Sequence, residues 1–139
     1  MVSMDVANDE PLTPETRGQM NAVRDALLGL HKLLMDDERR AYERVHGRVS
    51  PNELLQLLMS DSPFAWLRTV SGLVARIDEM VSPKAGAGEQ EGRKLLAYVR
   101  DTMMPSETAL GFGAKYHEAI QRVPEILLAH REVRKLLGE

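Results

Sequence analysis

A helical repeat of apolar residues extends over residues 20–45 and sets the scale of the fold. The apolar side chains recur at helical spacing, which places them in one stripe of an α-helix. Thr13 can cap this helix, Pro14 suits its first position and Gly47 can end it. At about 1.5 Å per residue, a helix over residues 13–45 is nearly 50 Å long, so burying its stripe requires other helices along its side. The stripe consists of Met20, Val23, Leu27, Leu30, Leu34, Ala41 and Val45.

Two further helix starts follow. Ser50 and Glu53 have the spacing of a capping box, and Ser62 precedes Pro63 in the same way as Ser50 precedes its own proline. Over residues 64–81 the apolar residues again recur at helical spacing. We therefore expect two short helices that together form a broken second leg.

The second half of the chain contains a connection and two more legs. The segment "SPKAGAGE", residues 82–89, has the composition of a flexible connection. A helix around Leu95 should follow and end at Pro105. The last leg, over about residues 113–137, is interrupted by Pro124, which removes one backbone hydrogen bond and should bend the helix.

Four legs joined by short turns predict an all-α fold, an antiparallel four-helix-bundle-like domain with a broken second leg and a Pro-kinked last helix. We expect this single domain to cover residues 13–139. Residues 1–12 are polar and aperiodic, which predicts a flexible N-terminal tail. Another pairing of the legs, or a homodimer that completes the core over the short third leg, fits the pattern nearly as well.

Composition agrees with helices and excludes several classes of function. The chain is 43% hydrophobic but only 4% aromatic, a profile that suits packed helices better than sheets. Basic and acidic residues are interspersed and the net charge is −3, so we expect no nucleic-acid or membrane partner. The lack of cysteine, of a signal-peptide pattern and of an apolar run of about 18 residues predicts a soluble cytoplasmic protein.

Polar side chains inside the apolar stripes are the candidate functional residues. His31 and Glu38 lie within the stripe of the first helix, and His130 and Tyr116 lie on the apolar side of the last leg. An ionised carboxylate in such a stripe costs several kcal/mol unless it is paired, so Glu38 needs a partner. His130, Arg134, Tyr116 or a ligand could provide one.

Three interpretations of these residues remain open. In the first, they form a buried hydrogen-bonded network that fixes helix register. In the second, Glu38 reaches solvent instead. In the third, His31, Glu38 and His130 hold a metal ion, or they line a ligand site together with Tyr116. We predict that the protein has no cofactor, and the alternative is a bound metal ion.

Phe64 and Trp66 are the candidate interface residues. Large rings of this kind often anchor protein interfaces. Alternatively, the two rings plug the end of the bundle where the second leg is broken.

Three other motifs do not indicate a functional site. Glu43 and His46 have the spacing of a di-iron ligand pair, but no second Glu-x-x-His occurs and Glu43 faces away from the stripe. His117 lies at the border of its stripe and is interpreted as a surface residue. "KAGAGEQEGRK" lacks the Gly-Lys-Ser/Thr ending of a phosphate-binding loop.

The segments "FAWLRTVSGLVARIDE" and "HKLLMDDERRAYERVHGRVSPNELLQLL" resemble a pattern found in small bacterial helical proteins to which no activity is assigned. The resemblance implies a bacterial origin and carries over no functional residue.

The sequence thus favours a non-enzymatic, cytosolic helical bundle that acts through protein–protein contacts or self-association. The alternative is a helical bundle that binds a metal or small cofactor through inward-facing histidine and glutamate.

Overall fold

The protein is described by a computed structural model that covers residues 9–60, 63–108 and 110–139. Within these ranges the regular structure is helical, and the one extended pairing is an isolated bridge between Pro11 and Gly88. The α-helices are α2 (Pro14–His46), α3 (Pro51–Met59), α4 (Arg68–Val81), α5 (Glu89–Thr102), α6 (Phe112–Arg122) and α7 (Pro124–Leu136), with short 3-10 turns η1 (Ala65–Leu67) and η2 (Pro83–Ala85).

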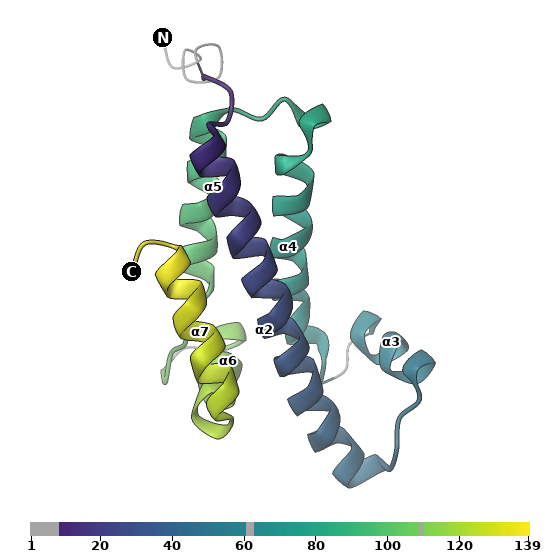
Figure 1. Ribbon diagram of the computed structural model, residues 1–139. Coiled ribbons are helices and arrows are strands. Elements are labelled where there is room, and N and C mark those ends of the chain that lie inside the picture. The colour runs from purple at the N-terminus through teal and green to yellow at the C-terminus, as the bar shows by residue number, and fades with distance from the viewer. Residues whose placement is uncertain (1–8, 61–62, 109) are drawn as a thin grey trace.

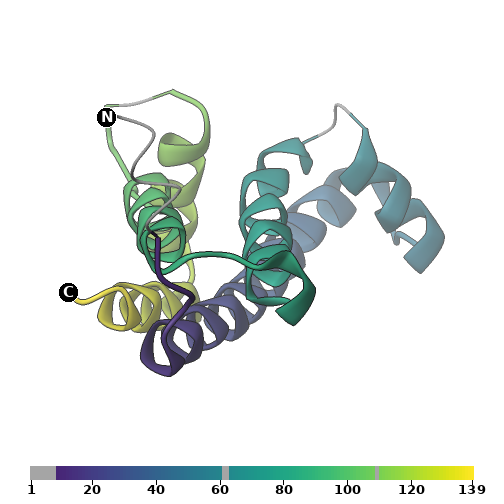
Figure 2. The same ribbon diagram turned by 90° about the horizontal axis from the view of Figure 1, so that it is seen from above.

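Helix α2 is the central rod of the molecule. Helices α4 and α7 run antiparallel to it and α5 runs parallel to it (Figure 1). Viewed from above, α4 packs on one side of α2, and α5 and α7 pack on the other (Figure 2). This arrangement confirms the predicted all-α, bundle-like fold. Among the described residues, none of the helices combines the length and the apolar character that crossing a lipid bilayer would require.

Both ends of α2 form as predicted. The Thr13 hydroxyl accepts a hydrogen bond from the backbone N–H of Thr16 at 3.1 Å, and the N–H of Gly47 donates to the carbonyl of Glu43 at 2.9 Å. Gly47 has φ +83°, a conformation in which glycine is strongly favoured.

The apolar stripe of α2 is buried over most of its length. Its members from residue 20 to residue 34 are at most 1% exposed, whereas Val45 is 77% exposed. The expectation for Val45 is therefore wrong, because the last turns of α2 extend past the other helices of the bundle (Figure 1).

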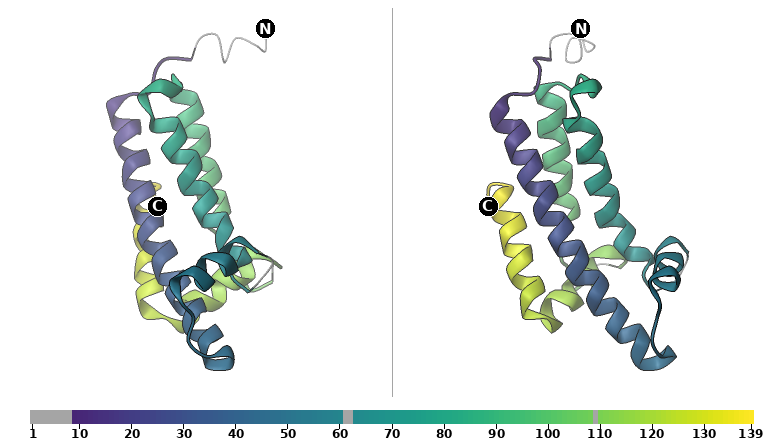
Figure 3. Two further views of the ribbon diagram at one scale, coloured as in Figure 1. Left: turned by 90° about the vertical axis from the view of Figure 1, so that its right-hand side faces the viewer. Right: turned by 45° about the vertical axis from the view of Figure 1, so that its right-hand side comes forward.

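Helix α3 stands apart from the bundle and contacts η1 (Figures 1 and 3). Its predicted capping box is present, because the N–H of Ser50 donates to the Glu53 carboxylate at 3.1 Å and the N–H of Glu53 donates to the Ser50 hydroxyl at 3.2 Å. Ser62, the expected cap of the next helix, lies outside the described residues. Helix α4 begins at Arg68, after the turn η1, so the second leg is broken as predicted.

The break at Pro124 is a reversal of the chain rather than a bend in one helix. Val123 is extended, with φ −124° and ψ 112°, so α6 ends before it and α7 begins after it. Tyr116 and His130 are hydrogen-bonded at 2.7 Å, whereas 14 residues of continuous helix would span about 21 Å. The two helices therefore fold back on each other.

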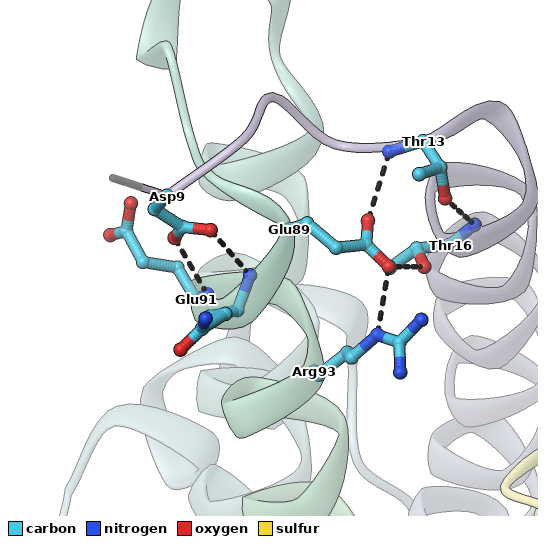
Figure 4. Close-up of polar contacts among 7 residues, drawn as sticks. Asp9, Thr13, Thr16, Glu89, Glu91 and Arg93 are labelled. Carbon is cyan, nitrogen blue, oxygen red and sulfur yellow. Dashed lines mark hydrogen bonds and ion pairs between the residues drawn. The ribbon is translucent and has the colours of Figure 1, made fainter. Parts of the chain in front are cut away.

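Residues 9–12 of the expected tail pack against the start of α5 (Figure 4). The Asp9 carboxylate accepts hydrogen bonds from the N–H groups of Gln90 and Glu91, at 2.8 and 3.3 Å, and so caps a helix whose own N-cap is glycine. The tail prediction is corrected for these residues, since Leu12 is also buried. Residues 1–8 lie outside the described residues.

Glu89 in turn ties the start of α5 to the start of α2 (Figure 4). Its carboxylate accepts hydrogen bonds from the Thr13 N–H at 2.9 Å, the Thr16 hydroxyl at 2.5 Å and the Arg93 guanidinium at 2.8 Å. These donors, the Thr13 N–H first, hold the pKa of Glu89 at about 2. Glu89 is therefore ionised at neutral pH and acts as a fixed anion between the two helix N-termini.

Candidate functional site

Two of the predicted site residues, Tyr116 and His130, form one pair. The Tyr116 hydroxyl on α6 lies 2.7 Å from Nδ1 of His130 on α7, and the rings meet edge to face with their centroids 5.2 Å apart. Tyr116 is fully buried and His130 is partly buried. The pair joins the two helices at the end of the molecule where the chain reverses.

Both members of this pair are neutral at pH 7. Burial raises the pKa of Tyr116 above its ordinary value. Burial also lowers the pKa of His130, and the nearby Arg134 and Arg131 lower it further. A neutral phenol is the better donor, so Tyr116 donates to Nδ1 and the ring proton of His130 lies on Nε2. A phenol held in this way is not a nucleophile or a base at neutral pH.

Glu38 has a partner that the sequence did not indicate. Its carboxylate on α2 accepts a hydrogen bond of 2.9 Å from the indole N–H of Trp66 on η1. The expected partners His130, Arg134 and Tyr116 make no hydrogen bond or ion pair with Glu38 in the described part of the chain. The prediction that one of these three groups pairs directly with Glu38 is therefore wrong, because the carboxylate bonds to the indole, which itself contacts Phe112 of α6.

Phe64 is not an interface residue in this fold. Its side chain is 0% exposed and lies 5.7 Å, ring centroid to ring centroid, from Tyr42 of α2. Trp66 is partly buried, and its indole N–H donates a hydrogen bond to the Glu38 carboxylate. The interface prediction is corrected for Phe64, and the alternative that both rings close the broken end of the second leg agrees with the packing.

Four side chains make a continuous series of ring contacts, which we name the aromatic cluster: Trp66, Phe112, Tyr116 and His130. Successive ring centroids lie 5.7, 5.3 and 5.2 Å apart. Glu38 closes one end of the series through the indole. The predicted residues Glu38, Tyr116, His130 and Trp66 thus belong to one packed unit that joins α2, η1, α6 and α7.

His31 is not part of this unit. It is partly buried on α2, and burial lowers its pKa. Hydrogen-bond partners for it are absent among the described residues. Within the same residues, no three His, Asp or Glu side chains lie close enough to hold a metal ion. The structure therefore does not bring His31, Glu38 and His130 together as a metal centre.

Asp37, the most buried acidic side chain of α2, is a further inward polar residue that was not among those predicted. Its carboxylate accepts hydrogen bonds from Nε and Nη2 of Arg122 on α6, at 3.2 and 2.5 Å. The Asp37 side chain is 10% exposed and that of Arg122 is 46% exposed. Residues 20, 23, 27, 30, 34, 37 and 41 follow a regular three-four spacing, so the position was visible in the pattern. This ion pair holds α6 against α2.

No protein-family model, curated protein or solved structure matches this chain.

Proposed function

We propose that the protein acts by contact with other protein molecules, without catalysis, and that α3 is its docking element. The observation that carries this proposal is that α3 is apolar on two faces and only one of them is covered. Leu54 is 8% exposed on the covered face, whereas Leu55 is 56% exposed and Met59 is 72% exposed.

The uncovered face of α3 has the character of a contact surface. Leu55 and Met59 are four residues apart and so lie on the same side of the helix. Glu53 is the one charged residue of α3, and its carboxylate is already used in the capping box. Leucine and methionine side chains on a helix are normally buried, and a helix of nine residues gains little stability by itself. The partner should therefore present an apolar, uncharged surface.

The interior of the bundle supports this proposal indirectly. A metal- or cofactor-binding function through His31, Glu38 and His130 would need these groups to face one cavity. Glu38 and His130 are instead bonded to Trp66 and Tyr116. Their polar atoms are used in holding the helices together.

Site-specific photocrosslinking in the native host tests the proposal. A benzoylphenylalanine introduced at position 55 should give a discrete crosslinked protein, and Met59→Lys should abolish that adduct. The Met59→Lys chain should keep its stability within about 0.5 kcal/mol, since the side chain is exposed. Position 128 on α7 is the matched control, because Leu128 is 64% exposed but lies on another helix. No adduct from position 55, or the same adducts from position 128, would contradict the proposal.

A further inference from the structure

A second surface, separate from α3, combines an apolar centre with an ordered set of charges. We name it the α4–α5 face, and it consists of Arg76, Glu79 and Met80 on α4 and Glu91, Lys94, Leu95 and Tyr98 on α5. Two adjoining hollows of about 280 and 320 Å³ lie along it and share Arg76, Met80 and Glu91. The two helices lie side by side (Figure 3, left).

The centre of this face is apolar and aromatic. Leu95 is 3% exposed at its floor and Met80 is partly buried. Tyr98 is 50% exposed, and the guanidinium of Arg76 lies over its ring at 4.8 Å from the centroid. Tyrosine, methionine and arginine are residue types that protein interfaces favour. Arg76 contacts Tyr98 on this face, and Met80 lines the same hollow.

The charges of the face form two rows. Glu79 lies three residues after Arg76 on α4, and Glu91 lies three residues before Lys94 on α5. Helices α4 and α5 run in opposite directions and are joined through η2 (Figure 1). Both acids therefore lie toward the η2 end of their helices, and both bases lie about 4.5 Å further along. The face therefore has an acidic row and, next to it, a basic row.

These charges are not neutralised by the residues that the structure describes. In the described ranges, neither Arg76, Glu79 nor Lys94 has an ion-pair partner. Glu91 accepts a hydrogen bond from the Gly88 N–H at 3.0 Å but pairs with no base there. Exposed charges beside an apolar centre are available to a partner with the opposite arrangement.

We propose that the partner at the α4–α5 face is a second copy of this chain. A two-fold axis that lies in the plane of the contact, parallel to the two rows and between them, sets the acidic row of one copy against the basic row of the other. Self-complementary surfaces of this kind are what a two-fold symmetric dimer requires. Met80 of each copy then lies close to the axis, and Tyr98 of each copy lies over the η2 end of the face of the other, about 8 Å from the axis. This inference goes beyond the proposed function, and it does not depend on α3.

Charge exchange between copies tests the inference. Sedimentation equilibrium of the full chain, from low micromolar to near-millimolar concentration, should show a mass that rises from 15.6 kDa toward twice that value. Arg76→Glu and Glu79→Lys should each weaken the dimer at least about tenfold, because two-fold symmetry introduces every unfavourable contact twice. An equimolar mixture of the two variants should restore the dimer.

Two controls make the test specific. Arg131→Glu reverses an exposed charge on α7 and should leave the dimer unchanged. The double variant Arg76→Glu/Glu79→Lys exchanges the two charges within α4 and so keeps opposite charges facing each other across the axis. It should therefore form a tighter homodimer than either single variant. Circular dichroism confirms that each variant is folded. A wild-type mass of 15.6 kDa at every concentration, single variants that dimerise like the wild type, or an equal loss in Arg131→Glu would overturn the inference.

Discussion

Replacing Phe64 with alanine is expected to lower the free energy of unfolding by about 3–5 kcal/mol. The ring is fully buried where the chain enters η1, and it packs against Tyr42 of α2. Removing it leaves a cavity that the surrounding helices can close only in part. Urea denaturation followed by circular dichroism measures the loss directly.

Leu128→Ala is the matched control for Phe64→Ala. Leu128 is 64% exposed, so this substitution should change the free energy of unfolding by no more than about 0.5 kcal/mol. If Phe64→Ala were equally mild and instead reduced association, Phe64 would be a contact residue after all, and the packing described here would be wrong.

Replacing Arg122 with methionine is expected to lower the free energy of unfolding by about 1–3 kcal/mol, because it leaves a nearly buried acceptor without its partner. The substitution keeps most of the side-chain volume but leaves the Asp37 carboxylate, 10% exposed, without its cation. The remaining charge has lost its solvation as well as its two hydrogen bonds. The same urea titration measures the effect, and Arg131→Met on the exposed side of α7 should be nearly neutral.

The double variant Asp37→Leu/Arg122→Met should recover most of the stability that Arg122→Met loses. Replacing both members of the pair removes the desolvation cost of the Asp37 carboxylate together with its attraction to the guanidinium. If instead the two substitutions add, Asp37 and Arg122 are not coupled and the contact between α2 and α6 has been misplaced.

The ends of the helices could be predicted from the sequence because they depend on local chemistry. Thr13 and Gly47 bound α2, and Ser50 with Glu53 forms the capping box of α3. Capping involves residues within one turn of each other, so the required information lies in a few consecutive positions. The burial of α2 from residue 20 to residue 34 follows in the same way from its three-four repeat.

The partners of the inward polar residues could not be predicted, because they depend on how the helices are rotated and where the chain reverses. Glu38 meets Trp66, 28 residues later, and Asp37 meets Arg122, 85 residues later. A helical wheel shows which side of a helix a residue occupies but not which helix packs there. Pro124 marked the break, but only the extended Val123 shows that α6 and α7 fold back on each other.

The central claim is that polar side chains inside the bundle form hydrogen bonds to one another rather than converge on a ligand. Nitrogen NMR of the His31 and His130 imidazoles tests this claim most directly. Spectra recorded against pH, with and without Zn²⁺, should show His130 with an unprotonated Nδ1 and a pKa below the ordinary 6.5 of histidine. The metal should leave both rings unchanged. Zinc-induced shifts of both rings that disappear in Glu38→Gln would contradict the claim and restore the site that the sequence suggested.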